Sequence, residues 1–174
     1  MQERIRLLGL MGIISLAACV TVVGQTTSKD ARSSEAYISE ADVYFQQHDF
    51  KSAIPLYRKA LDLQKKKPTI DKTHWRLLVD SLGQSYGISG DLKNAKATYT
   101  YGLKNDPTYW AFHYNMACTY AEMDDVDNAI LHLRKAFEKR DKTIKYPDPW
   151  TDGSFQRLIG NEKFVNALRE IHIN

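Results

Sequence analysis

Cysteine and histidine are the side chains in this sequence that could support nucleophilic chemistry or bind a metal. Cys118 follows His113 by five residues, and a thiolate beside an imidazole is a pairing that hydrolases use. On a helix, however, five residues separate two side chains widely around the axis, and cysteine commonly fills a small buried position. The sequence contains no H-E-x-x-H motif and no Cys/His pair at metal-ligand spacing. We therefore expect no catalytic residue, no metal and no cofactor.

The remaining motifs also argue against an enzyme and against a nucleic-acid partner. The sequence has no G-x-S-x-G, no P-loop and no G-x-G-x-x-G. The acidic string at 124–127 lacks the twelve-residue loop and terminal glutamate of a calcium-binding EF-hand. With 24 Lys and Arg against 21 Asp and Glu, the net charge of +3 is too balanced for a protein that coats nucleic acid, and only the run Lys65–Lys67 is locally basic.

The first 24 residues have the pattern of an export signal. Arg4 and Arg6 give a positive start, and residues 7–23 contain no charge. A charged start, an apolar run and small residues before a polar stretch are typical of a secretory signal peptide. The sequence therefore predicts a signal peptide at 1–24, a flexible linker at 25–33 and a protein exported to the bacterial periplasm or secreted.

Two processing routes remain open within that segment. Leu16-Ala17-Ala18-Cys19 resembles the lipobox of bacterial lipoproteins, in which the cysteine is lipidated. The run 20–23 stays apolar beyond Cys19, which favours ordinary cleavage after Gly24. Membrane attachment is then expected only through a Cys19 lipid or through an uncleaved N-terminal segment, which would make the protein a membrane-anchored lipoprotein or a membrane-anchored protein.

The elements that must position any site come from a repeat. Three stretches share a small residue, a ring three positions later, a second small residue twelve positions after the first, and a large apolar residue four beyond that. In chain order the members are Ala41, Tyr44, Ala53 and Tyr57; Gly83, Tyr86, Ala95 and Tyr99; Ala117, Tyr120, Ala129 and Leu133. Steps of three and four residues place side chains on one helical face, so each copy predicts two helices joined by a short turn.

Each predicted turn carries an aspartate that can cap the second helix. The turn pairs are His48-Asp49, Gly90-Asp91 and Asp124-Asp125. An aspartate there can accept hydrogen bonds from the N–H groups that open the helix. Gly90 suits the left-handed backbone that such a turn often needs. His48 and Asp124 take its place in the other two copies at some cost in conformational energy.

This skeleton resembles the tetratricopeptide repeat, a helix–turn–helix unit of about 34 residues. The second and third copies are offset by 34 residues and the first two by 42, so eight extra residues lie between Leu61 and Trp75. They predict a longer inter-repeat connection, with or without extra turns on the flanking helices. The resemblance implies an all-α solenoid (an alpha-alpha superhelix) at 34–145. Its expected repeats are 34–67, 76–109 and 110–143.

A C-terminal helical cap is expected at 146–174. The prolines of Tyr146-Pro147-Asp148-Pro149-Trp150 break the helix, and apolar residues then return at helical intervals. The third repeat has no fourth repeat to cover its apolar side, so this segment must cover it. The residues expected to do so are Phe155, Leu158, Phe164 and Leu168.

The resemblance implies a non-catalytic interaction scaffold or adaptor, here in the cell envelope, that binds an extended segment of another protein in a concave groove. The alternative is a structural, self-associating subunit of an envelope complex, and the oligomeric state stays open. Relatives that clamp a C-terminal carboxylate use Lys, Arg and Asn, of which only Asn115 is matched, so that activity is not expected. The groove positions include carboxylates and no Lys or Arg, which implies that the bound segment of the partner is neutral or basic. Phe45 and Tyr114 are expected to be its apolar anchors. The groove positions carried over are Asp42, Phe45, Gln46, Asp80, Gln84, Ile88, Tyr114, Cys118 and Glu122.

Overall fold

The computed structural model describes residues 32–138, 143 and 145–173 of the 174-residue chain. The chain divides into two units, 1–31 and 32–174, and the described helices belong to the second. The predicted signal peptide, the Cys19 lipidation site and most of the linker lie outside the described residues. None of the described helices is long and apolar enough to cross a membrane.

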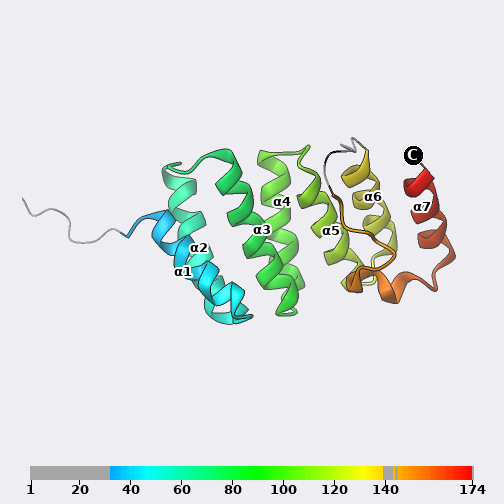
Figure 1. Ribbon diagram of the computed structural model, residues 1–174, viewed down its shortest axis with the longest axis horizontal. Coiled ribbons are helices and arrows are strands. Elements are labelled where there is room, and N and C mark those ends of the chain that lie inside the picture. Colours follow the sequence, from blue (N-terminus) through cyan, green and yellow to red (C-terminus); the bar gives the residue numbers. More distant parts are fainter. Residues whose placement is uncertain (1–31, 139–142, 144, 174) are drawn as a thin grey trace, which may run out of the picture. The chain divides into compact units, whose positions relative to one another are not determined.

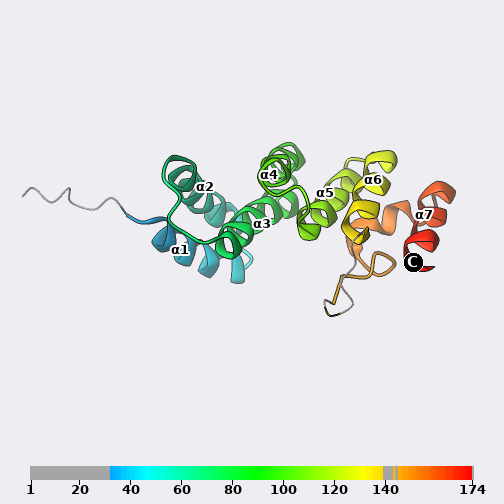
Figure 2. The same ribbon diagram turned by 90° about the horizontal axis from the view of Figure 1, so that it is seen from above.

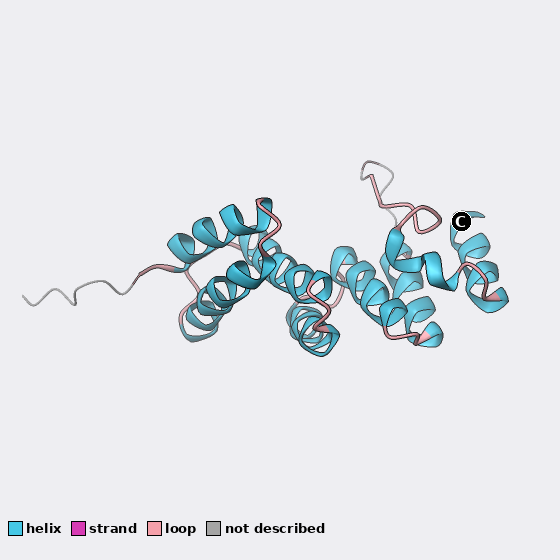
Figure 3. Cartoon of the chain, turned by 90° about the horizontal axis from the view of Figure 1, so that it is seen from below, coloured by secondary structure: helices cyan, strands magenta, loops and turns pink. Residues whose placement is uncertain are grey.

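The described residues form helices and loops only, as Figure 3 shows, which confirms the predicted all-α solenoid. Six helices form three consecutive pairs, followed by a 3₁₀ helix and a last α-helix. The elements are α1 (Ser34–Gln46), α2 (Phe50–Lys66), α3 (Lys72–Ile88), α4 (Leu92–Asn105), α5 (Trp110–Glu122), α6 (Val126–Phe137), η1 (Gly153–Leu158) and α7 (Glu162–Ile173). Figure 1 shows them following one another in chain order, as in a repeat array.

The first helices of the pairs lie on one side of the array and the second helices on the other. Figure 2 shows α1, α3 and α5 along one side and α2, α4 and α6 along the opposite side. The segment that leads into η1 lies on the side of α1, α3 and α5, and η1 packs against α5. The face formed by the first helices is therefore the one that the C-terminal region partly covers.

The turns within the pairs confirm the predicted caps. Each second helix begins after an aspartate whose side chain accepts a hydrogen bond from a backbone N–H three residues later, at 3.1 or 3.2 Å. The pairs are Asp49 with Ser52, Asp91 with Asn94, and Asp125 with Asn128. The residues before these aspartates, His48, Gly90 and Asp124, have φ values of 59°, 81° and 58°. Three copies thus use one turn geometry, although only one of them supplies glycine.

The eight extra residues lie mainly in helix, which corrects the expected second-repeat start at residue 76. Helix α2 has 17 residues against 14 in α4, and α3 has 17 against 13 in α5. The connection at 67–71 is only one residue longer than the one at 106–109. The second pair begins at Lys72 because Asp71 accepts a hydrogen bond from the N–H of His74 at 2.9 Å and caps the helix there.

Small residues on one helix meet rings on the next in the second repeat. A Cβ placed on Gly83 would lie 2.4 Å from the ring of Tyr99, and one on Gly102 would lie 2.9 Å from the ring of Phe112. Both rings are almost fully buried. The close approach of α3 to α4, and of α4 to α5, therefore depends on the absence of a side chain at two positions.

The C-terminal cap covers the third repeat as predicted. Phe155, Phe164 and Leu168 are fully buried, and Leu158 is 5% exposed. They share one hydrophobic cluster with apolar residues of α5 and α6, against which Trp150 also packs. Burying an aromatic or leucine side chain contributes about 1.5–3 kcal/mol, so this cluster supplies much of the stability of the C-terminal end.

Candidate functional site

A cavity of about 700 Å³ opens on the face formed by α3 and α5. The residues before and within the start of η1 form one of its walls. Its lining combines polar side chains with apolar and aromatic ones, as in sites that take a ligand or a partner's side chain. The lining includes Asp80, Gln84, Ile88, Trp110, Tyr114, Asn115, Cys118, Glu122, Asp152 and Ser154.

Asp80 carries the negative charge at the inner wall of this cavity. Its Oδ1 accepts a 2.6 Å hydrogen bond from the side-chain amide of Asn115, and its Oδ2 accepts a 2.8 Å bond from that of Gln84. Burial raises the pKa of Asp80 to about 6, although both hydrogen bonds act to lower it. The carboxylate is thus held by neutral donors from two helices, and its charge is poorly solvated.

Tyr114 and Cys118 lie one helical turn apart on α5, beneath the C-terminal segment. The hydroxyl of Tyr114 donates a 2.8 Å hydrogen bond to Asp152, and Tyr114 is only 3% exposed. Its ring packs edge-on against Phe155, with centroids 5.8 Å apart. This corrects the expectation that Tyr114 is an anchor available to a partner, because the chain itself covers it.

The Cys118 thiol is not activated. Burial raises the pKa of Cys118 well above its usual range, and the nearby carboxylate of Asp152 acts in the same direction. Cys118 lines the cavity between α3 and α5, whereas His113 lines a different cavity between α5 and α6. The two side chains that could have formed a nucleophile and base therefore do not meet.

Glu122 lines the cavity from the last turn of α5, and Arg157 of the cap contacts it. Arg157 of η1 donates a 3.0 Å hydrogen bond to the backbone carbonyl of Glu122, in the last turn of α5. The same guanidinium lies 3.7 Å from the Glu122 carboxylate and 3.6 Å from that of Asp124. The groove was expected to contain no Lys or Arg, and the cap supplies one arginine in contact with its lining residue Glu122.

Six of the nine predicted groove residues line this cavity: Asp80, Gln84, Ile88, Tyr114, Cys118 and Glu122. The three on α1 do not. Asp42 accepts a 2.6 Å hydrogen bond from the hydroxyl of Tyr57, Phe45 packs edge-on against Phe50 with centroids 5.3 Å apart, and Gln46 is exposed. The predicted set is therefore divided between the cavity and the separate surface of α1.

Sequence reasoning missed the wall contributed by the C-terminal segment. Pro147, Asp152 and Ser154 line the cavity, and Trp110 lines it at the start of α5. Pro147 and Pro149 indicated only where a helix ends, because the local sequence does not predict which surface the chain after them contacts. Only Asp152 could have been recognised from the sequence, as a capping residue two positions before Ser154. Its side chain accepts a 2.9 Å hydrogen bond from the N–H of Ser154 and caps η1.

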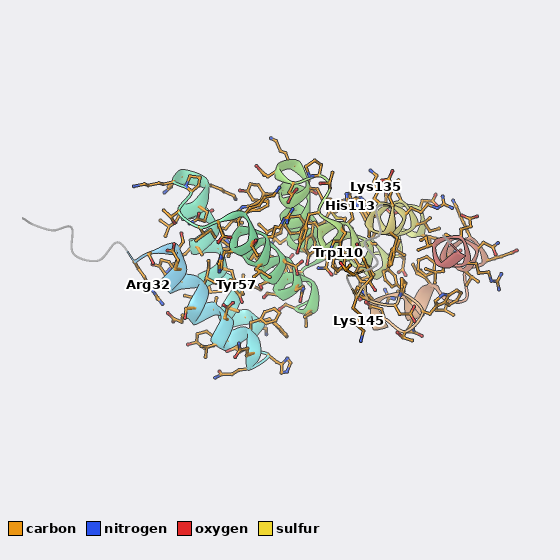
Figure 4. All side chains as sticks on the ribbon, turned by 45° about the horizontal axis from the view of Figure 1, so that its top comes forward. Arg32, Tyr57, Trp110, His113, Lys135 and Lys145 are labelled. Atoms are coloured by element: carbon orange, nitrogen blue, oxygen red, sulfur yellow. The ribbon has the colours of Figure 1, made fainter. Side chains whose placement is uncertain are left out.

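A second cavity, of about 490 Å³, lies between the start of α5 and α6 and contains a histidine pair. The Nδ1 atoms of His113 and His132 are 3.1 Å apart, and Nε2 of His113 lies 2.9 Å from the carbonyl of Pro107. Figure 4 shows His113 near Lys135, which also lines this cavity. Burial lowers the pKa of both histidines, and His113 and Lys135 lower that of His132 further, to about 4. The pair is therefore neutral at physiological pH.

Other candidate sites from the sequence are held by local contacts. Lys65 and Lys66 lie in the last turn of α2, and the ammonium of Lys65 lies 4.7 Å from the ring centroid of Tyr101. Within the described part of the chain, no group of three or more His, Cys, Asp or Glu residues is placed to hold a metal ion. What the described surface offers is thus a cavity between helices of neighbouring repeats.

Comparison with known families agrees with the helix pairs. Models of the tetratricopeptide repeat match residues 34–67 and residues 111–138. These ranges correspond to the pair α1 and α2 and to the pair α5 and α6, and α3 and α4 form a pair of the same kind between them. Among the curated proteins, none matches the chain. Repeats of this family serve as protein–protein interaction modules, and the chain is a tetratricopeptide repeat protein.

Proposed function

We propose that this protein is a non-catalytic adaptor that binds an extended segment of a partner protein along the face of α1, α3 and α5. The observation that carries the proposal is the cavity between α3 and α5, which is open on that face and is lined by six residues expected from the family pattern. An extended segment can cross several first helices and place one side chain in the cavity. Most of its affinity is then expected at this point.

Apolar side chains along α1 and α3, with Ile88 at the cavity itself, support a segment with apolar anchors. Ile88 is 61% exposed and lines the cavity, and Leu77, on the same helix, is 54% exposed. Phe45, on α1, is half-buried. With Tyr114 covered by the cap, we assign the anchoring contacts to Ile88, Leu77 and Phe45.

The cellular setting of the proposal rests on the N-terminal sequence. The charged start and apolar run of residues 1–24 support export, and Cys19 supports lipid attachment as the alternative to cleavage after Gly24. We therefore place the adaptor in the cell envelope or outside the cell. The intact mass of the protein from its native host tests this: loss of residues 1–24 or a diacyl mass on Cys19 supports export, and retention of Met1 excludes cleavage.

Site-specific photo-crosslinking tests the binding face. A photoreactive phenylalanine analogue replaces Ile88, and in a matched variant it replaces Leu131, an aliphatic residue of α6 that is 46% exposed and outside the cavity. We expect a partner to be crosslinked from position 88 and not from position 131. With that partner purified, Ile88→Glu should weaken binding about tenfold or more, and Leu131→Glu should not.

Two outcomes would contradict the proposed groove. Crosslinking to the partner from position 131 alone would assign binding to the opposite side of the array. Crosslinking of the protein only to itself, together with a sedimentation coefficient that rises with concentration, would favour the self-associating structural subunit instead.

A further inference from the structure

Asp80 is a poorly solvated carboxylate whose partners are neutral. Both of its oxygens accept hydrogen bonds from amides, those of Asn115 and Gln84. None of the described residues that line its cavity is a lysine or an arginine, and within the described part of the chain Asp80 forms no ion pair. Burial raises its pKa to about 6, so at neutral pH the ionised form persists at an energetic cost. A cation that entered the cavity would offset that cost.

The other carboxylates at the cavity already have donors. Asp152 accepts from the Tyr114 hydroxyl and from the N–H of Ser154, and Glu122 faces the guanidinium of Arg157. Asp80 is therefore the carboxylate of the lining at which an incoming positive charge gains most. Ile88 and Trp110 line the same cavity, and their apolar side chains suit the methylene stem of a long basic side chain.

We propose that the cavity between α3 and α5 binds a lysine or arginine side chain of the partner segment, with Asp80 as its counter-ion. The inference rests on the proposed function, because it names the side chain that the groove selects. A volume of about 700 Å³ is within the usual range for ligand sites and accommodates either side chain. Charge-assisted hydrogen bonds in a poorly solvated site are stronger than neutral ones, so selectivity for a basic residue follows.

Blocked peptides provide the test. Acetylated and amidated heptapeptides share one background of Ala, Ser and Leu and differ only at the central residue, which is Lys, Arg, norleucine or Glu. Calorimetry at pH 7.5 should show the Lys and Arg peptides binding about tenfold or more tightly than the norleucine peptide, and the Glu peptide binding most weakly. Asp80→Asn should remove this preference. Asp62→Asn, which removes the same charge from an exposed site on α2, should retain it.

A second variant and a second measurement guard against misfolding of Asp80→Asn. Gln84→Lys places an ammonium one turn from Asp80 on the same helix, and it should also abolish the preference for a basic residue. Carbon-13 NMR of the Asp80 carboxyl should show its pKa falling from about 6 when the Lys peptide is bound. The titratable groups around it are Tyr99, Tyr109, Cys118, Glu122 and Asp152. Affinity for the Lys peptide should therefore fall between pH 7 and pH 5, and affinity for the norleucine peptide should change less.

The outcomes separate this inference from the proposed function. Equal affinities for the Lys and norleucine peptides, an unchanged Asp80 pKa, or no binding by any peptide overturns the inference. If the norleucine peptide binds as tightly as the Lys peptide and Ile88→Glu weakens both, the groove function stands without the basic side chain. If crosslinks arise only from position 131, the groove function itself fails.

Discussion

The hydroxyl of Tyr114 donates a hydrogen bond to Asp152, 38 residues later, at 2.8 Å. One partner lies on the first helix of the third repeat and the other at the start of η1. The bond joins the groove face of α5 to the cap, and it places the edge of the cap in the wall of the cavity. Substitutions at Tyr114 are therefore expected to change the stability of the C-terminal end, and any effect on binding must be separated from that change.

The Tyr114–Asp152 contact should show energetic coupling. Tyr114→Phe removes the donor and should lower the free energy of unfolding by about 1–2 kcal/mol. In a double-mutant cycle with Asp152→Asn, measured by urea unfolding, we expect a coupling energy of about 0.5 kcal/mol or more. Additive effects of the two substitutions would show that the contact contributes little.

Phe164 should be a costly side chain to remove from α7. It is fully buried against the third repeat, and truncation to alanine loses its transfer free energy and leaves a cavity. Phe164→Ala should lower the free energy of unfolding by about 3–5 kcal/mol. Val165→Ala, at a half-buried position on the same helix, is the control and should cost far less. Similar melting temperatures for Phe164→Ala and the wild type would exclude a stabilising role for the cap.

Gly83→Ala should destabilise the second repeat because its Cβ would meet the ring of Tyr99 at 2.4 Å. Adding Tyr99→Leu should recover part of the loss, since the third repeat has Ala117 and Leu133 at these two positions. The control is Gly87→Ala on the same helix, whose Cβ would lie 3.9 Å from Ala95. That change should be neutral or stabilise by up to about 1 kcal/mol in thermal unfolding. Equal effects at Gly83 and Gly87 would contradict the close-packing argument.

Asp80 should make the protein more stable as the pH falls. Its pKa is about 6 in the folded chain and about 3.8 when unfolded, so between these values the folded state binds the extra proton. The free energy of unfolding gains up to roughly 3 kcal/mol from this group between pH 7 and pH 4. Asp80→Asn should therefore be more stable than the wild type at pH 7.5, and the difference should vanish near pH 4. A difference independent of pH would contradict the raised pKa.

His132 should act in the opposite direction over nearly the same range. Its folded pKa of about 4 lies below the unfolded value of 6.5, so the stability present above pH 6.5 is lost as the pH falls toward 4. His132→Asn can keep the hydrogen bond to His113 and should reduce this acid loss by roughly 1–3 kcal/mol in urea unfolding. His74→Asn, at an exposed position, should not reduce it. An unchanged acid loss in His132→Asn would exclude the pair as its source.

The helix pairs and their turns could be predicted from the sequence because their causes are local. Steps of three and four residues define a packed helical face, and an aspartate after a left-handed residue defines a capped turn. The partner of Tyr114 could not be predicted in this way. Asp152 is brought to it by the packing of η1 on α5, and no spacing in the sequence encodes that contact.

The cavity was predictable only in part, for the same reason. The family pattern identified the faces of α3 and α5, so Asp80, Gln84 and Ile88 were found. It could not show that the covering segment would add Pro147 to the wall, or that Tyr57 would engage Asp42. These relationships depend on which side chains meet across repeats and across the cap.

The contact of the cap with both helices of the third pair bears on how such an array can lengthen. Repeat arrays grow by tandem duplication of a unit that contacts only its neighbours. The third pair here also contacts η1 through α5 and α7 through α6, so a copy inserted after it would separate the cap from the surface that fits it. The first two pairs carry no such attachment within the described residues. Duplication upstream of α5 would therefore preserve both the cap and its matched surface.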